Sequence, residues 1–99
     1  MSEPSVHNCN LNIRYDLPAE QWEKVAAVYR KMPGWIGYIE GIPYWFGEES
    51  DGVTVSASVE PSGLFFDARM DAHEWGRWIE QFKAEATRAL GFEVGEPED

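Results

Sequence analysis

Residues 53–70 have the sequence VTVSASVE-PSG-LFFDARM, in which two strand-like runs flank a short turn. In the first run, Val53 to Glu60, apolar and polar residues alternate, as they do in a strand with one buried face. Proline presets a turn and glycine tolerates positive φ, so Pro61-Ser62-Gly63 predicts a tight connection to a second strand, Leu64 to Met70. The stretch therefore predicts an antiparallel hairpin with Val53, Val55, Ala57 and Val59 facing inward.

Further strands are predicted on the N-terminal side of this hairpin. The run Tyr44 to Glu48 is separated from it by Ser50-Asp51-Gly52, a second turn sequence, so three consecutive strands should form an antiparallel meander. Near the N-terminus, alternation over residues 7–16 predicts another half-buried strand. Residues 33–43 combine three glycines with large apolar side chains and fit neither period, which indicates an ordered loop or a short irregular strand.

Two amphipathic helices are predicted. Asp16 is a candidate N-cap with Pro18 in the first turn, and apolar residues then recur at helical spacing until Pro33-Gly34. Asp71 with Glu74 three residues later is typical of a capping box at the start of the second helix.

Gly91 is a typical C-terminal stop for the second helix. Residues 92–94 would then add a short last strand. The order β-α-loop-β-β-β-α-β predicts an α+β fold, a two-layer sandwich with both helices on one face of a mostly antiparallel sheet. We expect one domain over residues 1–99, with mobile ends at about residues 1–6 and 96–99.

The second face of the sheet is predicted to be open to water or to a partner. A one-residue slip in register would exchange the two faces. On the predicted register, the open face carries Asn10, Asn12, Trp45, Thr54, Ser56, Ser58, Phe65, Asp67 and Arg69.

Charge and cysteine content limit the classes of partner. The chain carries 18 acidic against 8 basic residues, a formal net charge of −10, which disfavours binding to nucleic acid and to anionic membranes. Cys9 is the only cysteine, so no intramolecular disulfide can form. The first eight residues lack the basic and apolar pattern of a signal peptide, and no apolar run reaches the roughly 20 residues that span a bilayer. We therefore expect a soluble cytoplasmic protein.

The segment from Met32 to Ala68 predicts a binding surface for a basic protein. It contains no lysine or arginine but six carboxylates and seven aromatic side chains. Aromatic anchors supply desolvated contact energy, and surrounding carboxylates accelerate encounter with a basic partner. The predicted contact residues are Trp35, Tyr38, Glu40, Trp45, Glu48, Glu49 and Asp51.

The sequence gives little support to catalysis, metal binding or a cofactor. Asp67, Asp71 and His73 lie close together in the chain and could form an acid/base site, but such a site needs groups that converge from elsewhere. An exposed strand end followed by a helix cap is the simpler interpretation. His7 and Cys9 share one strand face but supply only half of a metal site. We therefore predict no catalytic residues, no metal and no cofactor.

Three stretches resemble short bacterial proteins that act as immunity partners of contact-dependent or secreted toxins. They are Pro43 to Phe46, Ala57 to Leu64, and Trp75 to Phe82. The resemblance implies a cytoplasmic protein that binds and neutralises one cognate toxin domain, commonly a basic nuclease, by covering its active site or an essential surface. No binding residues are carried over from the family.

Alternative functions remain open at this stage. A small-ligand or regulatory module would require a concave apolar pocket with a few converging polar groups. A homodimer could form through an uncovered sheet edge or face, with the acidity serving only solubility.

Overall fold

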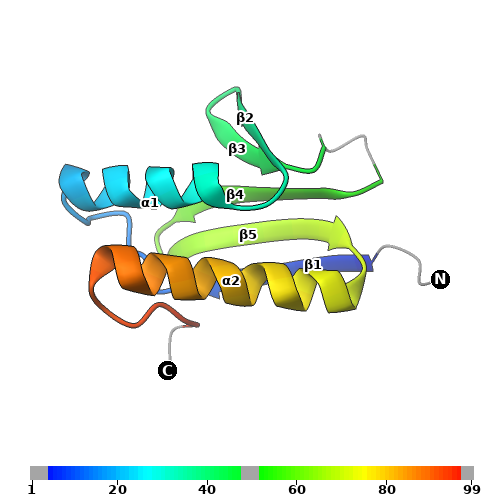
Figure 1. Ribbon diagram of the computed structural model, residues 1–99. Coiled ribbons are helices and arrows are strands. Elements are labelled where there is room, and N and C mark those ends of the chain that lie inside the picture. Colours follow the sequence, from blue (N-terminus) through cyan, green and yellow to red (C-terminus); the bar gives the residue numbers. More distant parts are fainter. Residues whose placement is uncertain (1–4, 48–51, 97–99) are drawn as a thin grey trace.

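The computed structural model describes residues 5–47 and 52–96, and it confirms an α+β fold with two layers. Helices α1 and α2 lie side by side over one face of a five-stranded sheet (Figure 1). The elements in chain order are β1 (Ser5–Leu11), α1 (Ala19–Lys31), β2 (Trp35–Ile39), β3 (Ile42–Trp45), β4 (Thr54–Glu60), β5 (Gly63–Met70) and α2 (Ala72–Leu90).

The sheet has the strand order β1-β5-β4-β3-β2, and all four pairings are antiparallel. The predicted meander is confirmed: β4 pairs with β5 so that Val55 faces Ala68 and Ala57 faces Phe66. The N-terminal strand β1 returns to the outer edge of β5, which places Cys9 opposite Phe66. This long-range pairing leaves β1 and β2 as the two edge strands.

Residues 35–39, which fitted neither period, form strand β2 and a hairpin with β3. The turn consists of Glu40 and Gly41, with φ of 53° and 82°, which is the pattern of a type I′ turn. The register shifts between Trp35 and Gly37, as in a β-bulge, and this extra residue disturbs the strand period in the sequence.

The expected last strand at residues 92–94 is wrong. The amide of Val94 donates to Thr87 Oγ1 (2.9 Å), which turns the chain back onto α2. Two hydrogen bonds then join it to Asn12, just past the end of β1. The backbone amide of Asn12 donates to the oxygen of Gly95 (2.9 Å), and the side-chain Oδ1 of Asn12 accepts from Gly95 N (3.0 Å). These contacts hold residues 92–95, which we call the C-terminal strap, in place without strand pairing.

The helix ends follow the sequence at α2 and differ at α1. Asp71 caps α2 by accepting from the amides of His73 (3.0 Å) and Glu74 (3.2 Å), and Gly91 ends it with φ of 83°. Asp16 does not cap α1, because the extended backbone of Pro18 occupies the N-cap position without a side-chain hydrogen bond. Asp16 instead pairs with Arg14 at 3.7 Å.

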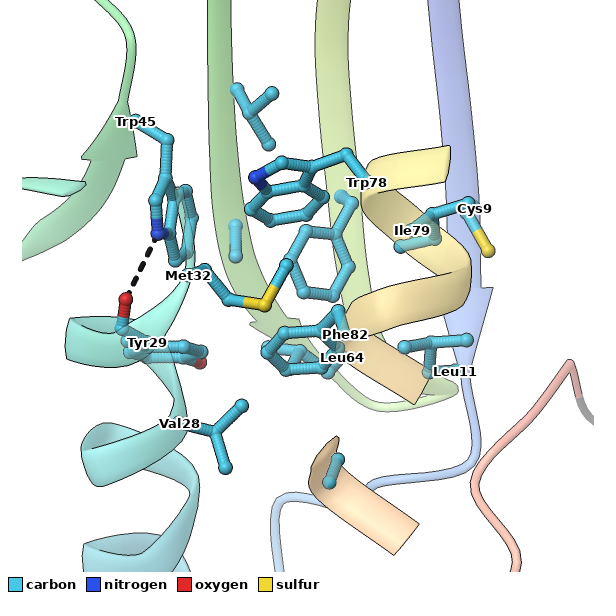
Figure 2. Close-up of a cluster of buried hydrophobic side chains, with 14 of the residues drawn as sticks. Cys9, Leu11, Val28, Tyr29, Met32, Trp45, Leu64, Trp78, Ile79 and Phe82 are labelled. Atoms are coloured by element: carbon cyan, nitrogen blue, oxygen red, sulfur yellow. Dashed lines mark hydrogen bonds between the residues drawn. The ribbon is translucent and has the colours of Figure 1, made fainter. Parts of the chain in front are cut away.

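An aromatic core joins the two helices to the sheet (Figure 2). Trp45 is fully buried, and its Nε1 donates to the backbone oxygen of Tyr29 (3.0 Å). Its ring packs edge-on against Trp78 with centroids 5.0 Å apart, and Trp78 Nε1 donates to the oxygen of Pro33 (3.1 Å). Both indole N–H groups are therefore satisfied inside the fold, as buried tryptophans require.

Most of the predicted open face is correct, with two corrections. Trp45 lies on the helix-covered face, because it pairs with the inward-facing Val55. Asn12 lies beyond the end of β1, where it holds the strap. Thr54 lies on the predicted face opposite Arg69, but it is buried there, and its hydroxyl donates to the oxygen of Gly47 (2.6 Å).

Candidate interaction surface on the β2–β3 hairpin

The β2–β3 hairpin stands at the edge of the sheet and rises beside α1 (Figure 1). It exposes three large apolar side chains: Ile36 at 48%, Tyr38 at 52% and Ile42 at 38%. Val59, near the end of β4, is 50% exposed although the alternation of β4 predicted it to face inward. Tyr38, Ile42 and Val59 line one groove, and because contiguous exposed apolar surface often marks a binding site, these three side chains form a candidate binding site.

A groove of about 310 Å³ lies between the hairpin, α1 and β4, and we call it the hairpin groove. It explains why Val59 is exposed, since no side chain of the described chain fills the space beside it. None of the described residues that line it is charged. They are Trp22, Ala26, Tyr29, Tyr38, Gly41, Ile42, Pro43, Ala57, Ser58, Val59 and Leu64.

Aromatic packing holds the position of Tyr38 at the rim of this groove. Its ring meets Trp35 edge-on at 5.4 Å, and Trp35 in turn stacks on Tyr29 at 6.3 Å. Burial, with a smaller contribution from Tyr38, raises the pKa of Tyr29 above its ordinary value, so this phenol stays neutral at physiological pH. The hairpin groove thus presents a preorganised apolar wall with no ionised group.

The hairpin's own charge is negative. Glu40 is exposed at the tip and makes no hydrogen bond or ion pair with any other described residue. Glu60, at the end of β4, accepts a hydrogen bond from Ser58 (3.1 Å). The ion pairs of the described chain lie elsewhere, between residues 14 and 16 and on the two helices. The hairpin therefore offers the carboxylate of Glu40 without a cation in its own sequence.

The structure separates the predicted contact residues into three groups. Tyr38 and Glu40 are exposed together on the hairpin, and Trp35 is partly buried beneath Tyr38. Trp45 is wrong as a contact residue, because it is fully buried and holds the core together. Glu48, Glu49 and Asp51 lie outside the described residues.

Sequence reasoning missed the other members of this surface. Ile42 carries no polar signal of exposure, and Trp22 fits the apolar stripe of α1, a pattern typical of core packing. Trp22 is only partly buried and lines the hairpin groove. The gap between α1 and the hairpin depends on packing between segments, so no local pattern marks it.

The residues considered for an acid/base site or a metal site do not come together in the fold. Asp71 is engaged as a helix cap, while His73 and Asp67 are exposed on different elements. His7 stacks on Trp75 with ring centroids 5.9 Å apart, and its Nε2 lies 3.1 Å from the oxygen of Met70. In residues 5–47 and 52–96, no group of three or more histidine, cysteine or acidic residues is placed to hold a metal.

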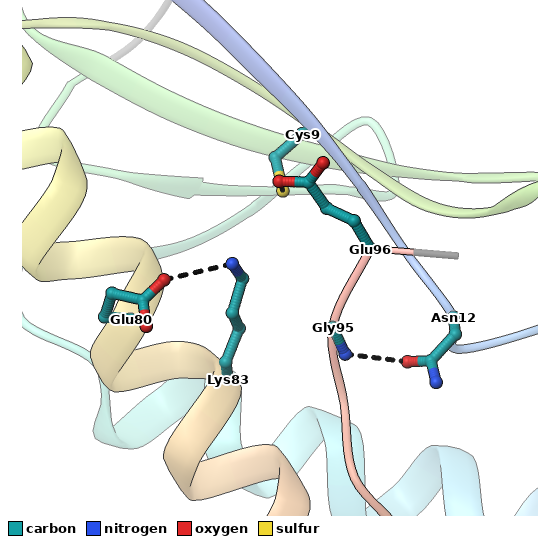
Figure 3. Close-up of polar contacts among 6 residues, drawn as sticks. All are labelled: Cys9, Asn12, Glu80, Lys83, Gly95 and Glu96. Carbon is teal, nitrogen blue, oxygen red and sulfur yellow. Dashed lines mark hydrogen bonds and ion pairs between the residues drawn. The ribbon is translucent and has the colours of Figure 1, made fainter. Parts of the chain in front are cut away.

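Cys9 lies under the C-terminal strap (Figure 3). Its Sγ donates to Glu96 Oε1 at 3.9 Å. Burial, together with the charge of Glu96, raises the pKa of the Cys9 thiol. A neutral and buried thiol is a poor nucleophile, so this cysteine has a packing role in the fold.

Comparison of the chain with protein-family models, with curated proteins and with solved structures found no match. Neither helix of the described chain has the length and apolar character needed to cross a bilayer.

Proposed function

We propose that this protein is an immunity protein that binds and neutralises a cognate basic toxin domain in the bacterial cytoplasm. The observation that carries the proposal is the exposed apolar cluster of Tyr38, Ile42 and Val59 around the hairpin groove. The cluster lies in a part of the sequence, residues 32–68, that contains no lysine or arginine.

This combination suits tight binding to a basic protein. Aromatic and aliphatic anchors that enter a desolvated contact supply most of the affinity of a typical interface. The net charge of −10 and the cation-free hairpin would steer a basic partner toward this side and speed its association. A fast and tight inhibitor is what a cell needs against a toxin that acts inside it.

The test starts from the partner. The tagged protein is purified from the cells that make it, and any stoichiometric partner is cloned and expressed alone in a sensitive host. The proposal expects that this partner stops growth, and that co-expression of the wild-type protein restores it. Tyr38→Ala should restore growth less well, whereas Val6→Ala, which changes an exposed side chain on β1, should act as wild type. A partner that is harmless when expressed alone would refute the toxin-neutralising role.

A small-ligand or regulatory module is the second candidate, and the hairpin groove is the observation that favours it. The groove is apolar, and the hydroxyl of Tyr38 at its rim can form a hydrogen bond. This function predicts a low-molecular-weight compound that co-purifies with the protein and is released on denaturation. Native and denaturing mass spectrometry of protein purified from its own cells would separate the two candidates.

A further inference from the structure

We propose that the hairpin groove and Glu40 form a two-part recognition site for a basic segment of the partner. An apolar side chain of that segment enters the hairpin groove, and an adjacent arginine or lysine pairs with the carboxylate of Glu40. This inference rests on the proposed function, and it specifies the chemistry that the partner must present.

The backbone at the tip of the hairpin gives the first argument. Glu40 has φ of 53°, in the left-handed region, at the first central position of the turn. Asparagine, aspartate and glycine are strongly preferred at that position, and a longer side chain is disfavoured there. The carboxylate of Glu40 makes no hydrogen bond or ion pair with another described residue, so no such contact offsets the cost of this conformation. An unfavourable residue at an exposed tip is consistent with a role outside the fold.

The size of the hairpin groove gives the second argument. Its volume of about 310 Å³ is at the lower end of the range of small-molecule pockets, roughly 300–1,000 Å³. That space is suited to one large apolar side chain from a partner. Gly41 lines the groove and follows Glu40 directly in the chain, so the backbone of Glu40 lies next to the apolar part of the site.

Charge complementarity selects the occupant. A second copy of this chain also carries −10, so mutual repulsion disfavours self-association at this site. A neutral apolar segment would leave Glu40 without a counter-ion at the rim. A basic segment with an apolar residue beside its cation satisfies both the groove and the carboxylate.

Matched probe peptides test this inference directly. Four acetylated and amidated tetrapeptides of the form Gly-X-Y-Gly carry the central pairs Leu-Arg, Leu-Gln, Leu-Glu and Ser-Arg. Each is titrated at low salt into the ¹⁵N-labelled protein, and the amide chemical shifts are followed by NMR. We expect the largest shifts from Tyr38 to Ile42 and at Val59, with Leu-Arg binding about two- to fivefold more tightly than Leu-Gln, the size of an exposed ion pair.

Two variants and two controls assign the parts of the site. Glu40→Gln should reduce Leu-Arg binding to the level of Leu-Gln, and Val59→Ser should weaken both leucine peptides. The matched controls are Glu93→Gln, an exposed glutamate on the strap, and Val6→Ser, an exposed valine on β1. Both controls should bind all four peptides as wild type does.

Several outcomes would overturn the inference. They are shifts outside the hairpin groove, no peptide-dependent shifts at all, or equal binding of the Leu-Arg and Leu-Glu peptides. The peptide experiment needs no toxin, and the growth assay needs no peptide. A failure of this inference is therefore distinguishable from a failure of the proposed function.

Discussion

Replacing Glu40 with asparagine should stabilise the protein. Glu40 has φ of 53° at the first central position of the type I′ turn, and Gly41 follows with φ of 82°. A left-handed conformation costs an L-residue about 1–2 kcal/mol, and asparagine tolerates it better because its short side chain hydrogen-bonds locally. Asn-Gly is also the preferred sequence for this turn.

The expected gain is a part of that cost, about 0.5–1 kcal/mol of unfolding free energy. Glu40 makes no described contact that the substitution would remove, so little should be lost in return. For a domain of this size, 1 kcal/mol corresponds to about 4–8 °C in Tm. We therefore expect Tm to rise by about 2–8 °C, and the midpoint of urea unfolding to rise with an unchanged slope.

Glu93→Asn is the matched control. Glu93 is exposed, lies outside helices and strands, and is not among the described residues with positive φ. Glu93→Asn removes the same charge as Glu40→Asn but relieves no strained turn, so its effect on stability should be small. A loss of stability in Glu40→Asn, or an equal gain in the control, would refute the argument. A loss would mean that the carboxylate of Glu40 stabilises the fold. An equal gain would mean that reduced charge repulsion, and not the turn, explains the effect.

Three further predictions concern the core, the second helix and the buried thiol. Trp45→Phe removes the hydrogen bond from Nε1 to the oxygen of Tyr29 and part of a buried ring, and should lower the unfolding free energy in guanidinium by about 1–3 kcal/mol. Asp71→Ala should cost about 1 kcal/mol by removing two hydrogen bonds to backbone amides, while Asp71→Asn keeps most of the cap, as thermal unfolding would reveal. Burial and Glu96 raise the pKa of Cys9 in the folded protein, so the folded chain keeps a proton that the unfolded chain loses above about pH 8.5. Stability should therefore be fully retained below that pH and fall as the pH rises through the folded pKa, and urea midpoints of Cys9→Ala should fall less over the same interval.

Local sequence patterns predicted the elements whose signals are local. The alternation of residues 54–58, the turn at Pro61 to Gly63 and the Asp71 cap all depend on neighbouring residues, and each is confirmed. Val53 and Val59, at the two ends of the predicted run, are exposed instead of buried. Strand β2 was less clear because its bulge shifts the side-chain period, although Gly41 already suited the turn. The strap at residues 92–95 could not be predicted, because it depends on contacts with Asn12 and Thr87 far away in the chain.

The candidate surface was predicted only in part, because some of its features are local in the sequence and others depend on tertiary packing. Tyr38 and Glu40 lie in an acidic, aromatic segment that charge patterning identifies, and both are exposed on the hairpin. Trp45 belongs to the same segment, but the pairing of β3 with β4 turns its side chain into the core. The hairpin groove arises from the spacing between α1 and the hairpin, and this tertiary relation has no counterpart in sequence periodicity.

The most direct test of the central claim is the affinity of the purified partner for two matched variants, measured by calorimetry. Tyr38→Ala truncates a 52% exposed ring at the hairpin groove, and Val6→Ala truncates a 66% exposed side chain on the opposite edge of the sheet. If the hairpin surface binds the partner, Tyr38→Ala should weaken binding about tenfold or more, as the loss of an aromatic anchor does, and Val6→Ala should leave it unchanged. Unchanged binding of Tyr38→Ala, or a larger loss in Val6→Ala, would place the interface elsewhere and contradict the account.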